Sequence, residues 1–456
     1  MVDVLELIDN PSARRSVSTR EMASLFLERV ASRTPIVHAV LTPCPELALA
    51  DADRVDEARR TGRPLPLDGM PIVLKDNIDV AGVRSACGSR FRIDHVASDD
   101  AFVVRLLREA GAVILGKSQS TEFMFALAAH PDFEPCTNPW DATRIPGASS
   151  SGSGAAVADD ECIGALGTDT GGSVRIPASF SGVTGLRPTH GLLSNTGVFP
   201  LARSLDTVGP MARSAIDVAD LFFVLAKFDP DDTRSVPYEP RRSMATNGRS
   251  TLRIGIPRQF FFDDCHPEIE HAVRQAIETF RSLGHTIAEV DLPLARVANE
   301  GFTLLIRAEA LTVHAERLAT RPDDFTSDVR DRLRLGEELT GRDVALLIED
   351  RHAWKRQIGE VFESSFDVVM TPTVACLPPR LEDARFGKLP DVTRLTYPWS
   401  FGQVPAISVP CGFTAGDLPI GLQIAGPAHA EWRLLDLARS YQAVTAWHRR
   451  RPPPSG

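Results

Sequence analysis

The chain has 456 residues, of which 43% are hydrophobic, 24% charged and 7% aromatic. These values are typical of a globular protein and exclude a disordered, collagen-like or coiled-coil chain. Sixty acidic against fifty basic residues give a net charge of −10, which disfavours sequence-independent binding to nucleic acid or to an anionic membrane.

No apolar run is long enough to cross a bilayer, and Asp3, Glu6 and Asp9 occupy positions where a signal peptide would be basic. The seven cysteines are scattered singly, without a Cys-x-x-Cys pair. This pattern favours a cytoplasmic location over a disulfide framework or a zinc ribbon. The histidines are also scattered, so the sequence predicts neither a metal site nor a cofactor.

Helix and strand patterns alternate along the chain. Ser18 and Glu21 form a capping-box pattern at the start of a helix. Further helices are predicted at 46–60, 101–110, 155–158 and 267–283, and buried strands at 72–74, 112–115, 252–256, 286–290, 406–410 and 420–424. These elements predict one α/β domain over residues 1–456, with a core motif region at about 65–215, a linker or excursion at about 229–251 and a helical insert at about 295–360.

The segment Gly111–Ser118 matches the phosphate-binding pattern G-x-x-x-x-G-K-[ST]. A phosphate-binding loop must leave its backbone N–H groups open, yet the residues between the two glycines are Ala-Val-Ile-Leu. These residues favour a buried strand, and a helical pattern precedes them where a phosphate-binding loop would follow a strand. We therefore interpret the segment as a core strand between two turn glycines.

Two stretches rich in small residues carry the candidate chemistry, Pro146–Gly154 and Gly167–Pro177. The second places Ser173 directly after Gly171 and Gly172, and paired glycines allow successive N–H groups to converge on an oxyanion. Ser173 is therefore a candidate nucleophile.

A serine nucleophile needs a base, and no histidine stands out by context; His190 is the nearest and more readily fits a turn or core role. Lys75 follows a buried apolar run, where an ammonium group is costly. A lysine in such a place either reaches water or an ion pair, or has a lowered pKa and can act as a general base. The residues alone leave both interpretations open.

The order of motifs along nearly the whole chain resembles the amidase signature family. The matching segments are Pro71–Asp79, Asn138–Asp141, Gly147–Gly154, Gly167–Pro177, Gly185–Thr189, Ser204–Pro210, Thr371–Thr373, Pro405–Pro410 and Gly421–Pro427. The resemblance implies an α/β fold with a central mixed, twisted sheet covered by helices on both faces and a helical insert.

The resemblance also implies a Ser-cisSer-Lys triad. Ser173 would be the nucleophile, Lys75 the base, and Ser149 the bridging serine, held across a cis peptide bond. The N–H groups of Thr170, Gly171, Gly172 and Ser173 itself would form the oxyanion hole.

Other matches to the family concern the substrate and the support of the loops. Phe123 and Met124 fall in a segment that lines the acyl pocket in relatives, although core packing explains them equally well. Ser150 and Ser151 would shape the serine loop, and Asp169 and Arg175 would brace the nucleophile.

The sequence departs from the family pattern at three positions that bear on the substrate. Ala148 stands beside Ser149 where the family usually has glycine, and Ser400 and Gln403 replace the more frequent Asn and Gly. These differences predict an altered substrate preference, with Ala148 and Gln403 as candidate substrate-binding residues.

The leading hypothesis is a hydrolase of linear carboxylic amides, with aryl esters or carbamates as further substrates. The alternative is the glutaminase subunit of a tRNA-dependent amidotransferase, although Asn195–Val198 and Ala202–Thr207 differ from the usual motifs of that group. An ATP-binding protein and a catalytically inactive scaffold are less favoured. The expected partner is a small-molecule amide or carbamate, with no nucleic acid and no membrane; a homodimer is allowed, but the sequence does not set the oligomeric state.

Overall fold

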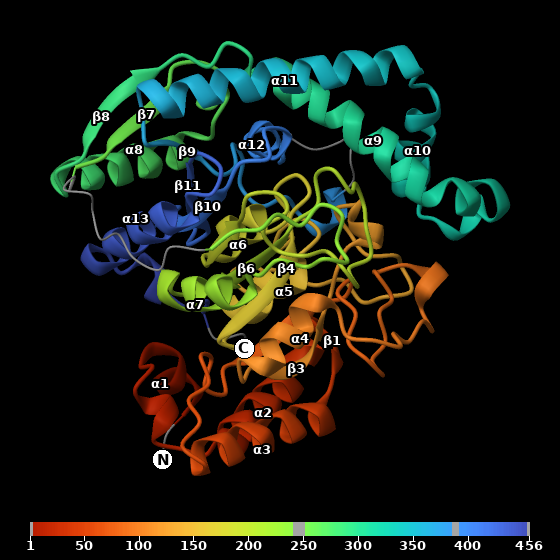
Figure 1. Ribbon diagram of the computed structural model, residues 1–456, viewed down its shortest axis with the longest axis vertical. Coiled ribbons are helices and arrows are strands. Elements are labelled where there is room, and N and C mark those ends of the chain that lie inside the picture. The colour runs from red at the N-terminus through yellow and green to blue at the C-terminus, as the bar shows by residue number, and fades with distance from the viewer. Residues whose placement is uncertain (1–2, 240–250, 385–391, 454–456) are drawn as a thin grey trace.

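A computed structural model describes residues 3–239, 251–384 and 392–453. The described residues form one 11-stranded mixed sheet in the order β1-β3-β2-β4-β6-β5-β10-β11-β9-β7-β8 (Figure 1). The strands are β1 (Val40–Pro43), β2 (Pro71–Lys75), β3 (Val113–Ser118), β4 (Gly164–Thr168), β5 (Thr184–Arg187), β6 (Val208–Ala212), β7 (Arg253–Pro257), β8 (Thr286–Val290), β9 (Val368–Pro372), β10 (Ala406–Phe413) and β11 (Pro419–Ala425).

Helices precede, connect and follow these strands. They are α1 (Val4–Asp9), α2 (Thr19–Val37), α3 (Pro45–Arg60), α4 (Phe102–Glu109), α5 (Ser151–Ala158), α6 (Arg175–Ser181), α7 (Ala215–Leu225), α8 (Pro267–Ser282), α9 (Ala295–Thr320), α10 (Ser327–Glu337), α11 (Gly341–Ser364), α12 (Tyr397–Phe401) and α13 (Glu431–Val444). The predicted α/β fold with a central mixed sheet is confirmed. Part of the linker predicted at 229–251 lies outside the described residues.

Helices cover both faces of the sheet. On β4, Gly164 faces the Leu221 side chain of α7, whereas Gly167, an odd number of residues away, faces Ser150 and Val174 beside α5 and α6. Helices α8 and α13 lie on the α7 side, where Phe280 and Tyr441 stack with ring centroids 5.1 Å apart. The central strands β2, β3 and β4 are therefore buried on both faces, whereas the edge strand β8 is largely exposed.

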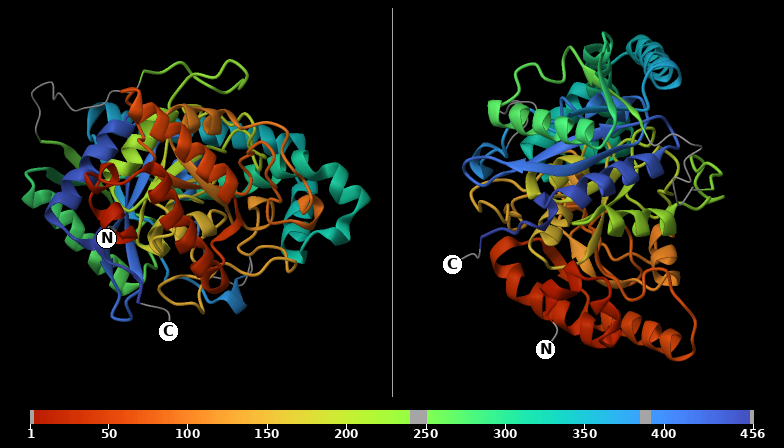
Figure 2. Two further views of the ribbon diagram at one scale, coloured as in Figure 1. Left: turned by 90° about the horizontal axis from the view of Figure 1, so that it is seen from below. Right: turned by 90° about the vertical axis from the view of Figure 1, so that its left-hand side faces the viewer.

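Helices α9, α10 and α11 occupy the segment predicted to be helical and lie at one end of the molecule, opposite α1 to α3 (Figures 1 and 2). They pack around an apolar cluster that is separate from the main core and includes Phe302, Trp354 and Trp399. Within the described ranges, no helix is long and apolar enough to cross a membrane.

The segment that matches the phosphate-binding pattern is the fully buried strand β3. Lys117 Nζ donates to Ser85 Oγ at 2.7 Å and to the Asp76 carbonyl at 3.2 Å, with no exposed surface. This agrees with the interpretation of Gly111–Ser118 as a core strand.

The parallel strands β2 and β4 place the candidate residues together. Leu74 pairs with Leu166, so Lys75 and Thr168 lie at the carboxyl ends of neighbouring strands. The serine-rich stretch enters α5 and the glycine-rich stretch enters α6 at the same edge. Carboxyl edges of parallel strands are common positions for active sites in α/β proteins.

Candidate active site

Lys75 lies at the end of β2 with no exposed surface. Its Nζ donates to Ser149 Oγ at 2.7 Å, to Thr168 Oγ1 at 2.7 Å and to the Thr168 carbonyl at 3.3 Å. Burial lowers the pKa of Lys75 to about 7, against the opposing attraction of the Asp206 and Asp169 carboxylates. The lysine is therefore bonded to neutral oxygens rather than to a carboxylate, and its ammonium form is only weakly favoured near neutral pH.

Ser149 is 2% exposed and receives the Lys75 hydrogen bond. The predicted cis peptide bond at this serine is wrong for this structure, because every peptide bond among the described residues is trans. The trans form is the ordinary lower-energy state of a non-proline bond. Ser150 links the same loop to β4, accepting from the Thr168 N–H and donating to the Thr168 carbonyl, both at 3.2 Å.

Ser173 is half-buried and lies two residues before α6. Its hydroxyl and the backbone N–H groups of Thr170, Gly171 and Ser173 form no hydrogen bond with any residue that the structure describes. By contrast, the Gly172 N–H donates to Asp169 Oδ1 at 2.7 Å. Of the four predicted oxyanion donors, three are thus unengaged and one is already used within the loop.

The glycine-rich loop requires its two glycines for space and backbone conformation. Gly172 has a φ of +122°, and a Cβ atom there would overlap Thr396 Oγ1. A Cβ atom on Gly171 would lie 2.5 Å from a Tyr397 ring carbon. Thr396 also donates to the Gly171 carbonyl at 2.6 Å, so the loop before α12 fixes the loop that precedes Ser173.

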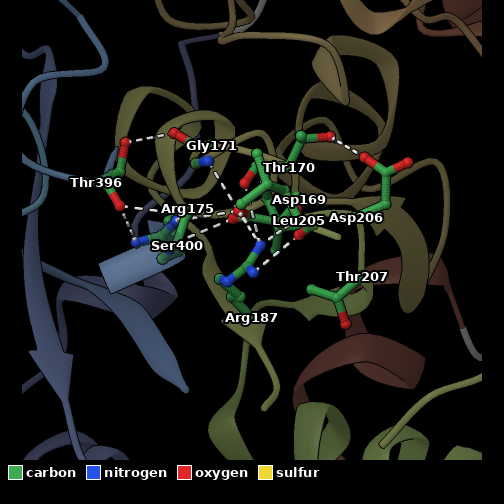
Figure 3. Close-up of polar contacts among 12 residues, drawn as sticks. Asp169, Thr170, Gly171, Arg175, Arg187, Leu205, Asp206, Thr207, Thr396 and Ser400 are labelled. Carbon is green, nitrogen blue, oxygen red and sulfur yellow. Dashed lines mark hydrogen bonds and ion pairs between the residues drawn. The ribbon is translucent and has the colours of Figure 1, made fainter. Parts of the chain in front are cut away.

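Asp169, in the glycine-rich loop, forms ion pairs with two buried arginines, Arg175 and Arg187 (Figure 3). Arg175 Nη2 and Arg187 Nη1 each lie 3.0 Å from Asp169 Oδ1, and Arg175 Nε lies 3.0 Å from Oδ2. Although burial opposes ionisation, these two guanidinium groups hold the pKa of Asp169 well below its usual range. Asp169 and Arg175 therefore brace the loop.

Arg175 extends this bracing network towards the C-terminal strands. It donates to Ser400 Oγ and to Gln423 Oε1, each at 2.7 Å. Ser400, one of the departures from the family pattern, is therefore buried against Arg175.

The predicted substrate residues lie in three different surroundings. Phe123 and Met124 are buried with left-handed φ values of 47° and 59°. Phe123 packs against the rings of Phe199 and His314. Ala148, next to Ser149, packs in a small apolar cluster.

Gln403 lies apart from the glycine-rich loop. It donates to the Ser204 carbonyl at 2.8 Å and accepts from Lys355 at 3.1 Å, in a separate pocket of about 480 Å³. His190 lines that same pocket and contacts the Arg203 carbonyl, while burial lowers its pKa to about 4. No contact joins either residue to Lys75 or Ser149.

Several residues of the site are not among those predicted from the sequence. Thr168 contacts Lys75 and lies inside the Gly167–Pro177 motif, so its position next to the strand end is a usable signal. Arg187, Asp206 and Thr396 contact the glycine-rich loop from segments 17 to 225 residues away. Arg187 and Asp206 lie in matched motifs whereas Thr396 does not, and for none of the three does the local sequence indicate the contact.

Within the described ranges, no group of three His, Cys, Asp or Glu residues could hold a metal ion. The arrangement contains a weakly basic buried lysine, a serine bonded to it, a second accessible serine and unengaged N–H donors. These are the components of nucleophilic acyl transfer.

A family model described as amidase matches residues 21–435. The chain belongs to the amidase family. The resemblance inferred from the motifs is thereby confirmed, and the enzyme class is that of C–N hydrolases.

Similar proteins place this amidase near one class of relatives in particular. A protein of Moorella thermoacetica named as a subunit of glutamyl-tRNA(Gln) amidotransferase is 38% identical, with 96% of each chain covered. A solved structure of the same subunit from Thermotoga maritima is 27% identical with a TM-score of 0.77, covering 97% of this chain and 95% of that one. A structure described in connection with a vestigial protein complex and an s-triazine catabolic enzyme has 29% identity and a TM-score of 0.89, covering 97% and 98%.

These relatives correct the predicted partners. The expectation of a small-molecule amide or carbamate partner, with no nucleic acid and a homodimer allowed, is wrong, because the relatives are named as a subunit of an enzyme for glutamyl-tRNA(Gln). The error has a physical source: net charge bears on sequence-independent binding and does not exclude a specific nucleic-acid partner.

Proposed function

We propose that this amidase cleaves a carboxamide C–N bond through an acyl-enzyme on Ser173, with Lys75 as the base and Ser149 as the proton relay. The observation that supports this proposal is the 2.7 Å contact between Lys75 Nζ and Ser149 Oγ in a fully buried setting. A lysine with a pKa of about 7 is partly neutral at neutral pH, so it can accept a proton where an ordinary lysine cannot.

In the first half-reaction, Ser173 Oγ attacks the amide carbon and forms a C–O bond. Its proton passes to Ser149, whose own proton passes to neutral Lys75. Negative charge develops on the carbonyl oxygen, where the N–H groups of Thr170, Gly171 and Ser173 can stabilise it. Ser149 then donates a proton to the amide nitrogen as the C–N bond breaks, and Lys75 returns its proton to Ser149. Ammonia or an amine leaves, and Lys75 is neutral again.

In the second half-reaction, water attacks the ester carbon of the acyl-enzyme and its proton passes through Ser149 to Lys75. The tetrahedral intermediate collapses and the C–O bond to Ser173 breaks, while the proton on Lys75 returns through Ser149 to Ser173 Oγ. The carboxylic acid leaves and the enzyme is regenerated. Protonation of the leaving nitrogen is the demanding step, because an unprotonated amide anion is a very poor leaving group.

We propose glutamine as the substrate and a role as the ammonia-releasing subunit of a tRNA-dependent amidotransferase. This is the alternative function considered from the sequence, and the names of the relatives favour it over the leading hypothesis of general amide hydrolysis. Charge near the glycine-rich loop also supports it: the Arg332 guanidinium, which lies 3.8 Å over the Phe125 ring, also interacts with Tyr397, whose ring packs against Gly171. This cation favours an acyl group that carries a carboxylate, as glutamine does. A cytoplasmic location is part of the same proposal.

Hydrolysis of another linear amide is a second candidate. It is favoured by the departures from the usual amidotransferase motifs at Asn195–Val198 and Ala202–Thr207. The same acyl-enzyme chemistry would serve both candidates, so the acyl pocket alone distinguishes them.

Ammonia release from glutamine tests the proposal. Ammonia release is measured for wild type and Ser173→Ala, first alone and then with the other amidotransferase subunits and glutamyl-tRNA(Gln). The same enzymes are also assayed with 4-nitroacetanilide and with a primary aliphatic amide as alternative substrates. Glutamine hydrolysis that rises when the subunits are added, and is lost in Ser173→Ala, is the expected result. Turnover of the anilide or aliphatic amide without glutamine hydrolysis would favour the second candidate instead. Equal activity in Ser173→Ala would contradict both.

A further inference from the structure

Asp206 is a buried carboxylate that the proposed mechanism does not use. It lies in the Ser204–Pro210 motif, two residues before β6, and is 7% exposed. Its Oδ1 accepts from Thr170 Oγ1 at 2.6 Å, and its Oδ2 accepts from the N–H groups of Leu201 and Ala202 at 2.9 and 3.0 Å. Among the described residues no arginine or lysine forms a salt bridge with it.

The Thr170 contact joins Asp206 to the loop that carries the nucleophile (Figure 3). The backbones on either side are also paired, since the Asp169 N–H donates to the Thr207 carbonyl at 2.8 Å and the Thr207 N–H donates back at 3.2 Å. This pairing continues the β4–β6 ladder by one step beyond Thr168 and Val208. Thr170 directly follows the last paired residue of this ladder, Asp169, and is the first residue with an unengaged N–H group. Asp206 therefore binds the side chain of Thr170 at the point where the regular backbone pairing ends.

We infer that Asp206 is a positioning residue of the active site: it anchors the oxyanion loop through Thr170 and places a buried carboxylate beside the end of the β4–β6 ladder, where Thr168 bonds the Lys75 base. This inference rests on the proposed function, because it concerns the base and the donors named there. The Asp206 contact fixes the Thr170 side chain, and the Asp169–Thr207 pairing fixes the backbone that precedes it, so together they restrict the Thr170 N–H group.

Electrostatics support the second part of the inference. Burial has the largest influence on the pKa of Lys75 and lowers it. The second largest influence is the attraction of the Asp206 carboxylate, which raises this pKa. Burial raises the pKa of Asp206 itself to about 6, and Glu309 of α9 acts in the same direction. Arg187 of β5 also faces Asp206, while Asp169 acts on Lys75 from the paired segment. Above pH 6 an ionised Asp206 thus keeps Lys75 protonated to a higher pH than burial alone would.

Two substitutions separate the two effects. Asp206→Asn removes the charge, so the pKa of Lys75 should fall and the acidic limb of activity should move to lower pH by about half a unit or more. It should also lower the rate at the plateau about tenfold through the disturbed loop.

Thr170→Val removes the hydroxyl but keeps the charge, so it should lower the plateau rate without moving the limb to lower pH. Asp229→Asn is the matched control, since Asp229 is also buried and accepts from Ser194 Oγ but exerts none of the main influences on Lys75.

The experiment uses phenylmethanesulfonyl fluoride, which reports activation of Ser173 without knowledge of the substrate. Ser173 Oγ attacks sulfur, an O–S bond forms, fluoride leaves, and the serine proton passes through Ser149 to Lys75. The inactivation rate constant is measured from pH 5 to 9 for wild type and the three variants, and peptide mapping confirms the labelled serine. A misfolded fraction that does not refold lowers the extent of labelling but not the rate constant, and circular dichroism over the same pH range confirms that each variant compared is folded.

The expected result is a lower rate and an acid-shifted limb in Asp206→Asn, a lower rate without that shift in Thr170→Val, and wild-type behaviour in Asp229→Asn. Asp206→Asn with the wild-type limb and a rate within twofold of wild type would overturn the inference. If Asp206→Asn does not fold, a Thr170→Val rate within twofold of wild type overturns the anchoring role by itself. Failure of the proposed function gives a different result: wild type unlabelled at Ser173, or equal inactivation of Ser173→Ala.

Discussion

Lys75 Nζ lies 2.7 Å from Ser149 Oγ, and neither residue is more than 2% exposed. Burial of a lysine beside neutral oxygens is unfavourable for its charged form. The same contact therefore gives the lysine a lowered pKa and a serine to act upon. The predictions below follow from this pair and from the loops that hold it.

Activity should rise with pH through about 7, because the neutral form of Lys75 is the proposed base and burial lowers its pKa to about 7. Lys75→Ala should lower kcat by about 10²- to 10⁴-fold and abolish this limb. The pH dependence of kcat/KM on a turned-over amide measures both effects. If kcat/KM of Lys75→Ala still rises with pH through about 7, the titrating group is not Lys75.

Lys75 should also make the free energy of unfolding depend on pH, because its buried ammonium form destabilises the folded state. Its pKa is lowered from 10.5 to about 7 in the folded state, so above pH 7 the unfolded chain binds more protons and stability rises with pH. Between pH 6 and 9 the wild type should gain about 2–3 kcal/mol from this residue, a gain absent in Lys75→Met. Urea unfolding at both pH values measures the difference, with exposed Lys227→Met as the control. Parallel pH dependence in wild type and Lys75→Met would contradict the burial argument.

Asp169→Asn should destabilise the fold by about 3–5 kcal/mol, because it leaves the guanidinium groups of Arg175 and Arg187 buried without their carboxylate. The pKa of Asp169 is lower in the folded than in the unfolded chain. The ionised carboxylate therefore contributes fully to the free energy of unfolding above its unfolded-state pKa, and this contribution is lost as the pH falls through its folded-state pKa. Asp53→Asn breaks an exposed pair with Arg20 and should cost less than about 1 kcal/mol. Similar losses for the two variants in denaturant unfolding would show that the Asp169 network does not hold the loop.

Gly172→Ala should abolish activity, because its φ of +122° disfavours a Cβ atom and that atom would overlap Thr396 Oγ1. Gly62→Ala is a matched control: its φ is +71°, but no atom lies within 4 Å of the added Cβ. The control should lose about 1 kcal/mol of stability and keep its activity. Wild-type kcat in Gly172→Ala would mean that the loop tolerates movement near Ser173.

The sequence predicts the elements whose signal is local. Strand β8 (Thr286–Val290) has the predicted bounds, and α3 and α8 agree to within a residue, because apolar periodicity and end signals mark them. Strands β5 and β6 carry glycine, arginine and proline and lack such a pattern, so their assignment depends on neighbours across the sheet.

The site divides in the same way. Lys75, Ser149 and Thr170–Ser173 lie in motifs and could be named in advance, whereas the contact of Thr396 with Gly171 joins residues 225 positions apart. Two errors came from sources other than local sequence: the cis bond at Ser149 came from the resemblance, and the absence of a nucleic-acid partner from net charge. Neither property is determined by the short segments that contain the chemistry.

The most direct test is mass spectrometry of the protein quenched in acid during turnover of glutamine or of the amide it prefers. The prediction is an acyl group on Ser173 in wild type, with none in Ser173→Ala and a strongly reduced amount in Lys75→Ala. An acyl group on another residue, or undiminished turnover in Ser173→Ala, would contradict the assignment of Ser173 as the nucleophile.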